Sequence, residues 1–457
     1  MASLPSPSVE LEPDRPNAEI RRGGPSARLA FAAPRRGETI VFAELSARSV
    51  DWGRPGAECA VLRVALDGKH ASDVIVLSER GAMRGVSLGH LEEGRHTVTF
   101  SVSDRSPAGA TSINVVDPLV VHANAGSAEE MVYRHAPVLY GRTLPELGGP
   151  QQNTVTDAPL VAWHCVTEKG TSRSIEYSVL WTHEDGGTDG PSLMAKWGRT
   201  TDIEWVYRVE VDARGDRLPG SAVIQGVEHA TRPFGGAYER DHPLLQTCTD
   251  NNMVSDRVDG DLRFFLAADG TIDPGRSRES VMDAETWIYA AMAGELHRAG
   301  LVERWRGPDD PSLGDPRDYL YVELDARPAG VAPIAEPLFA LGVRVAGDPM
   351  LYRSDRGAPE RALPATGPRR AAIRLPPGTR AEHVEELRAL RVDSDPRAEV
   401  LISDVMSAFF LDAAYRPHPV GARLPAPVRI GGFRRQAVLW SRLAEPRSDR
   451  SLEGGWV

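Results

Sequence analysis

Seven short runs of alternating apolar and polar sequence between residues 25 and 125 constrain the fold more than any other feature of this chain. They read RLAFAA, ETIVFAEL, AVLRVALDG, ASDVIVLS, RGVSLGHL, RHTVTFSVSD and TSINVVDPLVV. A period of two with many β-branched residues is typical of half-buried strands. Glycines such as Gly68 and Gly94 mark turns between the runs. We therefore expect an N-terminal β-sandwich over residues 25–125.

Part of this region resembles a known kind of accessory domain. The segment LDGKHASDVIVL, followed by VSLGHLEEGRHTVTFSV, is similar to small sandwich modules appended to carbohydrate-active enzymes. The resemblance implies an accessory β-sandwich. A structural β-module without any ligand is the alternative interpretation of the same hairpins.

The 457 residues are long enough for two or three domains. Residues 1–24 are proline-rich and polar, which predicts a disordered N-terminus. A linker at 122–131 precedes a central block, 132–270, where strand-like runs alternate with polar loops. The region 271–457 begins with a helix near 280–299, which Ser280 could cap, and continues as strand-like pieces with a short helix at 376–390. We expect a mainly β, multi-domain β-sandwich protein with one or two short helices.

Charge and targeting signals limit the possible partners. The net charge of -11 disfavours a general nucleic-acid binder, which needs a basic face for the phosphates. The three cysteines form no CxxC pair, and no apolar run is long enough to span a membrane. The first residues lack the apolar core of a signal peptide. We expect a cytoplasmic protein with a small-molecule or glycan ligand, while export by another route and the oligomeric state stay open.

A pair of acids opens one strand of the central block. In WGRTTDIEWVYRVEVD, Asp202 and Glu204 are two residues apart, so a strand places them on one face. Two carboxylates this close repel unless they are exposed, share a proton or hold a cation between them. A tentative divalent cation, Ca²⁺ or Mg²⁺, is one interpretation. An exposed edge neutralised by Arg199 or Arg208 is the other.

Further candidates come from neighbouring loops. THEDGGTDG supplies His183 and Asp185, which lie near Asp202 and Glu204 if the strands 174–182 and 204–212 are neighbours. An ordinary solvated turn is the alternative. Imidazole with carboxylate suits metal binding or general acid–base work. We predict the metal ligands Asp202, Glu204, His183 and Asp185, and the catalytic residues Glu204, His229, His183 and Asp250.

The central block also resembles a known family. The strand DIEWVYRVEVD, with YSVLWTHEDGG before it and VIQGVEHA and HPLLQTCTDNN after it, is similar to the necrosis- and ethylene-inducing-like proteins and to the vacuolar protein-sorting sixty-two-like family. The likeness covers residues 130–260. It implies a β-sandwich in which Asp202, Glu204, His183 and Asp185 surround a divalent cation. Thr201, Ile203 and the segment TDNN depart from the pattern of the family.

Three functions remain open on the sequence. The first is a metal-assisted or carboxylate-dependent hydrolase or lyase acting on a polar, glycan-like substrate. The tryptophans 163, 181, 197 and 205 could then form the floor of a sugar site, or simply pack in the core. The second is a non-catalytic, divalent-cation-dependent protein that binds a glycan or a lipid headgroup. The third is a purely structural protein of several β-domains.

Overall fold

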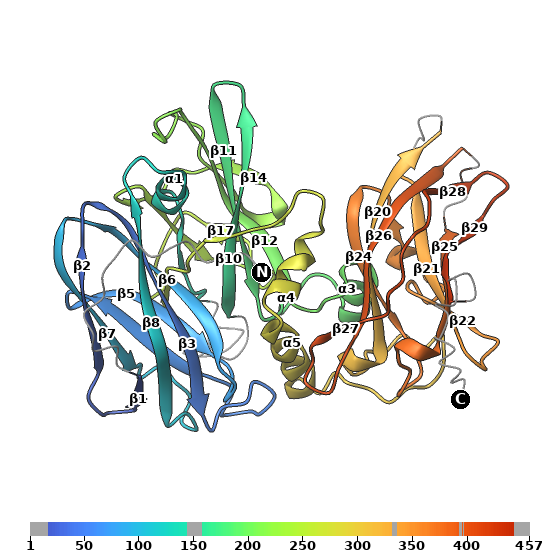
Figure 1. Cartoon of the computed structure of the whole chain (residues 1–457), viewed down its shortest axis with the longest axis horizontal. Coiled ribbons are helices and arrows are strands. Elements are labelled where there is room, and N and C mark those ends of the chain that lie inside the picture. Colours follow the sequence, from blue (N-terminus) through green and yellow to red (C-terminus); the bar gives the residue numbers. More distant parts are fainter. Residues whose placement is uncertain (1–16, 144–157, 331–335, 393–394, 396, 443–457) are drawn as a thin grey trace, which may run out of the picture. The chain divides into compact units, whose positions relative to one another are not determined.

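The computed structural model describes residues 17–143, 158–330, 336–392, 395 and 397–442. The chain is mainly β, with several sheets and a few short helices, so the predicted fold class is confirmed (Figure 1). It divides into two compact units. The first comprises Met1–Gly187, Thr200–Asp273 and Trp287–Gly300, and the second comprises Thr188–Arg199, Pro274–Thr286 and Leu301–Val457.

An N-terminal β-sandwich forms the first part of unit 1. One sheet has the order β1-β8-β3-β6 and the other has the order β2-β7-β4-β5. The strands are β1 (Ala18–Arg21), β2 (Ala27–Ala33), β3 (Gly37–Arg48), β4 (Ala60–Leu66), β5 (Lys69–Val76), β6 (Ala82–Leu91), β7 (Gly94–Val102) and β8 (Ser112–Asn124). Alternate residues of β2 are buried, as the sequence pattern predicts, and join the apolar core shared by both sheets.

The predicted disordered N-terminus needs a correction. Ala18–Arg21 forms β1, which pairs antiparallel with β8 and buries Ile20 to 2% exposure. Ile20 packs in the core of the sandwich, and this tertiary contact outweighs the polar composition around it. The remainder of the prediction, residues 1–16, lies outside the described residues.

Two further sheets of unit 1 come from the central block. A six-stranded sheet has the order β14-β13-β12-β11-β10-β19, and a second sheet has the order β15-β16-β9-β18 with β17 paired to β16. Their strands are β9 (Val138–Tyr140), β10 (Pro159–Lys169), β11 (Ser172–Trp181), β12 (Asp202–Val211), β13 (Val223–Gln225), β14 (Thr231–Pro233), β15 (Tyr238–Glu239), β16 (His242–Thr247), β17 (Val254–Ser255), β18 (Arg263–Phe264) and β19 (Gly270–Thr271).

A second β-sandwich forms most of unit 2. Its sheets have the orders β24-β20-β26-β27, with β28 paired to β26, and β22-β21-β25-β29, with β23 paired to β21. The strands are β20 (Tyr319–Ala329), β21 (Leu338–Val345), β22 (Leu351–Arg353), β23 (Leu363–Pro364), β24 (Gly367–Arg374), β25 (Val384–Arg391), β26 (Glu399–Leu411), β27 (Pro417–Pro419), β28 (Val428–Gly431) and β29 (Gln436–Ser441). A single apolar core lies between the two sheets.

The helices are short. The α-helices are α1 (Ala128–Arg134), α3 (Gly190–Trp197), α4 (Val281–Ala284) and α5 (Trp287–Arg298). The 3-10 helices are η2 (Val227–His229), η3 (Arg278–Ser280), η4 (Pro316–Asp318), η5 (Pro359–Arg361) and η6 (Ala381–His383). None of the helices in the described part of the chain is long and apolar enough to cross a membrane.

Two helix predictions were wrong in detail. The helix expected over 280–299 is interrupted at Glu285, whose φ of -110° and ψ of 65° are not helical, and Ser280 makes no capping hydrogen bond. The helix expected over 376–390 is only the short turn η6, followed by the strand β25. β25 pairs with β21 on one side and with β29 on the other, so ladder hydrogen bonds outweigh the helical propensity of VEELRAL.

Candidate functional site

The two strands that frame the predicted site are neighbours. β11 and β12 pair antiparallel, and Trp181 at the end of β11 lies opposite Asp202 at the start of β12. The loop that begins at Thr182 therefore starts beside Asp202. The two strands are thus neighbours, which is the condition under which the sequence placed His183 and Asp185 near Asp202.

His183 and Asp185 form one polar group with Asp202. His183 Nε2 lies 2.9 Å from Asp185 Oδ1, and Arg142 donates to the same carboxylate. Asn252 Nδ2 donates to Asp202 Oδ2 over 2.9 Å and to the backbone oxygen of His183 over 3.1 Å. Burial raises the pKa of Asp185, but the contacts with His183 and Arg142 lower it further, so the pKa lies below its usual range and the group is an anion at neutral pH.

Asp250 contributes its backbone to this group. Its carbonyl oxygen accepts from Asp185 N over 2.8 Å and from Gly186 N over 3.3 Å, while the residue as a whole is exposed. Asp250, which was predicted as a catalytic residue, thus lies beside Asp185 and Gly186.

Glu204 belongs to a different group. Gln225 Nε2 donates to Glu204 Oε2 over 2.9 Å and lies 2.9 Å from His229 Nδ1. His229 Nδ1 is 3.7 Å from Glu204 Oε1. Glu228 and His229 both have positive φ, 61° and 56°, a conformation that costs energy in residues with a Cβ.

The predicted site residues are therefore distributed over two groups. Asn252 joins His183 to Asp202, and Asp185 contacts both His183 and the Asp250 carbonyl, whereas Glu204 and His229 meet around Gln225. Of the four tryptophans considered for a sugar site, Trp163 and Trp181 are buried to 4% and 0% exposure and pack in the core, while Trp197 and Trp205 are half-buried.

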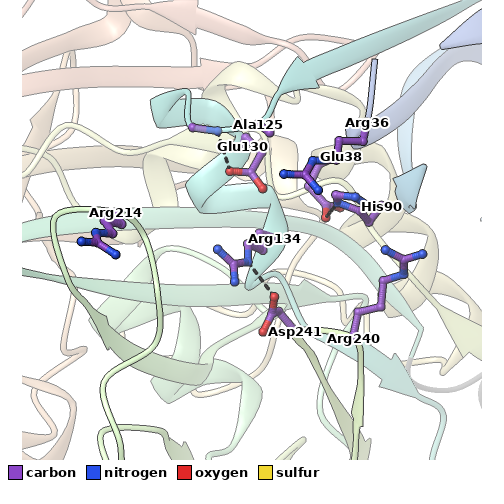
Figure 2. Close-up of a pocket in the computed structure, with 10 residues that line it drawn as sticks. Arg36, Glu38, His90, Ala125, Glu130, Arg134, Arg214, Arg240 and Asp241 are labelled. Atoms are coloured by element: carbon purple, nitrogen blue, oxygen red, sulfur yellow. Dashed lines mark hydrogen bonds and ion pairs between the residues drawn. The ribbon is translucent and has the colours of Figure 1, made fainter. Parts of the chain in front are cut away.

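A pocket with a different lining opens elsewhere in unit 1, with a volume of about 330 Å³. We name it the arginine pocket (Figure 2). It is lined by Arg36, Glu38, His90, Ala125, Gly126, Glu130, Arg134, Arg214, Arg240 and Asp241. Four guanidinium groups and three carboxylates thus share one cavity, and no aromatic ring other than an imidazole lines it. Such a lining suits a polar, charged ligand held by hydrogen bonds rather than by ring stacking.

Helix α1 supplies one wall of the arginine pocket. Ser127 caps the helix by accepting from Glu130 N over 3.1 Å, and Glu130 Oε2 accepts in turn from Gly126 N over 3.2 Å. One turn later, Arg134 Nε donates to Asp241 Oδ2 over 2.6 Å. Burial raises the pKa of Asp241, but the hydrogen bond and the charge of Arg134 lower it more, so Asp241 is ionised at neutral pH.

Glu38 and His90 lie opposite each other on β3 and β6 as a cross-strand pair. A β-bulge adjoins this pair, between Thr39 and Ile40 of β3. Gly89, which lies opposite Thr39, has a φ of 75°, which glycine adopts without a steric cost. Ligand atoms of Glu38, His90 and Glu130 all lie within 4.8 Å of one another. Among the described residues, this is the group of three or more with metal-ligand spacing, and it contains none of the four predicted ligands.

Sequence reasoning missed the residues of the arginine pocket. Glu38 opens the run ETIVFAEL and His90 ends the run RGVSLGHL, and both were interpreted only as strand positions. The available signal was a polar residue at the end of each strand. It becomes informative only when the pairing of β3 with β6 is known.

Unit 2 has a second pocket of about 370 Å³. Its lining combines apolar and charged side chains, namely Lys196, Trp197, Glu336, Leu338, Pro359, Glu360, Ala362, Pro364 and Arg369. Trp197, one of the tryptophans considered for a sugar site, lies in this pocket. Burial lowers the pKa of Arg369.

No family model and no curated protein matches the chain. Parts of it are similar to solved carbohydrate-binding modules. One is the CBM36-1 domain of a multidomain xylanase from the hindgut metagenome of Trinervitermes trinervoides, with 12% identity over 26% of this chain and 93% of the domain, at a TM-score of 0.19. Another is the CBM35 of Cellvibrio japonicus Abf62, with 14% identity over 22% of this chain and 75% of the module, at 0.16. A family 35 carbohydrate-binding module from an environmental isolate has 10% identity over 26% of this chain and 88% of the module, at a TM-score of 0.17.

These comparisons correct one expectation. The resemblance of residues 130–260 to the necrosis- and ethylene-inducing-like and vacuolar protein-sorting sixty-two-like families is wrong, because the similar structures are carbohydrate-binding modules and no family model matches. The strand DIEW also differs in its contacts. Asp202 accepts from Asn252 and Glu204 accepts from Gln225, so the two carboxylates have different hydrogen-bond partners.

Proposed function

We propose that this chain is a non-catalytic binding protein that recognises a polar, anionic glycan in the arginine pocket. The observation that carries the proposal is the convergence of Arg36, Arg134, Arg214 and Arg240 on one cavity of about 330 Å³. In a protein with a net charge of -11, such a cavity is a local reversal of charge. Guanidinium groups bind carboxylates and sulfates through paired, charge-assisted hydrogen bonds.

The arginines differ in how far they are already engaged. Arg134 is held by Asp241 and Asp216, with Nη1 to Asp216 Oδ1 at 3.0 Å. Among the described residues, the ion-pair partner of Arg240 is the exposed Glu92, at 3.5 Å. Arg36 and Arg240 are exposed, and Figure 2 shows their guanidinium groups on the His90 side of the cavity, so they are the residues best placed to meet a ligand.

Two features favour binding over hydrolysis. The acid and the base or nucleophile of a glycosidase are usually about 5–10 Å apart and must both reach the scissile bond. In the arginine pocket, ligand atoms of Glu38 and Glu130 lie within 4.8 Å, and the two residues are only 1% and 6% exposed. Carboxylates this close and this buried hold a positive charge better than they divide acid from base. The carbohydrate-binding modules that resemble parts of the chain share too little of the fold to bear on this choice.

The test is binding of the full chain to polygalacturonate, measured by isothermal titration calorimetry, with neutral galactan and inorganic phosphate as comparisons. We expect binding to polygalacturonate alone. Arg36→Ala and Arg240→Ala should each weaken it at least tenfold, because loss of a charge-assisted hydrogen bond costs about 1.5–3 kcal/mol. Both side chains are exposed, so the fold should not change.

A matched control is available in the second pocket. Arg369→Ala removes an arginine from the cavity in unit 2 and should leave polygalacturonate binding unchanged. Loss of binding in Trp197→Ala but not in Arg240→Ala would move the site to unit 2 and overturn the assignment. Equal binding of galactan, binding of phosphate alone, or release of reducing ends from the polysaccharide would each contradict the proposed function.

A further inference from the structure

Glu38 is an uncompensated carboxylate at the inner end of the arginine pocket. The residue is 1% exposed, and in the described part of the chain its ion-pair partners are histidines rather than Lys or Arg. His90 Nδ1 lies 3.4 Å from Glu38 Oε1, and His242 Nε2 lies 3.4 Å from Glu38 Oε2. Neither contact is a hydrogen bond, and Glu38 Oε2 is buried without a partner among the described residues. Burying a carboxylate in this state is costly unless a cation neutralises it.

The tautomer of His242 shows which of its ring nitrogens lies unprotonated beside Glu38. Its Nδ1 lies 3.0 Å from the carbonyl oxygen of Ala136, which can only accept, so Nδ1 carries the proton. In neutral His242, Nε2 is then a bare lone pair that faces Glu38 Oε2. Nε2 is also buried without a hydrogen-bond partner in the described structure. Two lone pairs that face each other in a buried site require a positive charge between them.

His242 also has the second contact that metal-binding histidines usually have. Such histidines donate their other ring N–H to a backbone carbonyl or a carboxylate, which fixes the tautomer and the ring orientation. The Ala136 carbonyl plays this part for His242, and Phe265 packs edge-on against the ring at 4.7 Å between centroids. The imidazole is thus held with its lone pair directed at Glu38.

The spacing of the remaining groups agrees with a metal site. A tetrahedral ion with bonds of about 2.0–2.1 Å separates its ligand atoms by about 3.4 Å, which is the distance from Glu38 Oε1 to His90 Nδ1. His242 Nε2 lies at the same distance from the other carboxylate oxygen, Oε2, and is not in the group of ligand atoms that all lie within 4.8 Å of one another. Glu130 contributes a second carboxylate, and its ligand atom lies within 4.8 Å of those of Glu38 and His90. The hydrogen bond from Gly126 engages Oε2 of Glu130, so Oε1 remains available.

We propose that Glu38, His90 and Glu130 bind a divalent transition-metal ion of the zinc class at the inner end of the arginine pocket, with His242 beside the second oxygen of Glu38. An imidazole with two carboxylates is a ligand set that Zn²⁺ and similar ions accept, whereas Ca²⁺ and Mg²⁺ prefer oxygen ligands alone. The proposed ion thus differs from the Ca²⁺ or Mg²⁺ expected near Asp202. Its role in ligand binding rests on the proposed function: it neutralises Glu38 and Glu130, which otherwise repel an anionic glycan beside the four arginines.

The test uses the full chain without an affinity tag, stripped with EDTA and titrated with ZnCl₂ or CaCl₂ in the calorimeter, without any glycan. We expect one Zn²⁺ per chain and no heat from Ca²⁺. His90→Ala should weaken Zn²⁺ binding at least tenfold, and its partly exposed position should tolerate the change. Glu130→Gln keeps the acceptor for Gly126 and removes only the charge, so weaker Zn²⁺ binding with an unchanged melting temperature of the metal-free protein is expected.

His96→Ala is the matched control, because His96 lies on the same sandwich and pairs with Asp67 outside the pocket. It should bind Zn²⁺ as the wild type does. Absence of Zn²⁺ binding, binding of Ca²⁺ instead, or unchanged binding in His90→Ala would overturn the metal site and leave a protonated histidine as the positive charge. Polygalacturonate titrations in EDTA and in Zn²⁺ separate the two proposals: Zn²⁺ binding without polygalacturonate binding overturns only the proposed function, and the reverse overturns only the metal site.

Discussion

Replacing Glu323 by Gln should destabilise unit 2 because this buried carboxylate is the centre of an ion-pair network with Arg276 and Arg370. Glu323 lies on β20 with 0% exposure. It accepts from Arg276 Nε over 3.0 Å, from Ser277 N over 2.8 Å and from Arg370 Nη2 over 3.1 Å. Arg370 is itself fully buried and also donates to Asp283 over 3.0 Å. A glutamine would point an amide N–H at one of these donors.

The pKa of Glu323 gives the size of its contribution to the free energy of unfolding. Burial raises this pKa, but the hydrogen bond from Arg276 and the charge of Arg370 outweigh the burial and lower it from 4.5 to about 2. Such a shift corresponds to about 3 kcal/mol of folding free energy above the unfolded pKa. Because the folded pKa is the lower one, this stabilisation is complete above about pH 5 and is lost as the pH falls towards 2. At pH 3 roughly half should remain.

Urea unfolding of the wild type and of Glu323→Gln at pH 7 and pH 3 measures the contribution of Glu323 to the free energy of unfolding and its dependence on pH. We expect a difference of about 3 kcal/mol at pH 7 that falls to about half at pH 3. Glu399→Gln is the control in the same unit, because Glu399 only meets Arg429 at 3.7 Å on the surface and should cost under about 1 kcal/mol. A difference below about 1 kcal/mol at pH 7, or an equal difference at both pH values, would refute the reasoning.

Two further predictions concern the N-terminal sandwich. Burial lowers the pKa of His96, but its hydrogen bonds to Asp67 and to the Glu92 carbonyl raise it more, so the folded pKa lies above the usual range. The stabilisation from protonated His96 is therefore lost as the pH rises through this folded pKa. Asp67→Asn, in which asparagine tolerates the φ of 48°, should lower the pKa of His96 in an NMR titration. Gly37→Ala would place a Cβ 2.2 Å from the Ala123 oxygen and should lower the melting temperature, at a cost of about 1–3 kcal/mol or more; an unchanged melting temperature would contradict this packing.

The strands of the fold were predictable where one face of a sheet is buried and the other is not. β2 shows the expected alternation, with Leu29, Phe31 and Ala33 in the core, and RLAFAA already contains that period. The strands β11 and β12 were also predicted, because aromatic and β-branched residues alternate in both, whereas their pairing was left open by the sequence. Local sequence carries this information, since side-chain direction in a strand follows residue number alone.

The errors arose where tertiary contacts decide. VEELRAL has good helix formers, yet β25 lies between β21 and β29 and gains ladder hydrogen bonds on both edges. The helix near 280–299 has a continuous apolar stripe, but it is interrupted at Glu285, where α4 and α5 belong to different compact units. Neither partner strands nor unit boundaries are encoded in a window of about twenty residues.

The site was harder to foresee than the fold for a reason that Glu38 makes explicit. Sequence reasoning selected acids that stand together along the chain, and the structure gave each of those acids its own hydrogen-bond partner: Asn252 for Asp202 and Gln225 for Glu204. Glu38 stands alone in the sequence, and its neighbours His90 and His242 come from β6 and β16, so its uncompensated charge exists only in the folded chain. The proposed metal site is therefore argued from the missing partner of a buried charge, and burial and pairing are both properties of the tertiary structure.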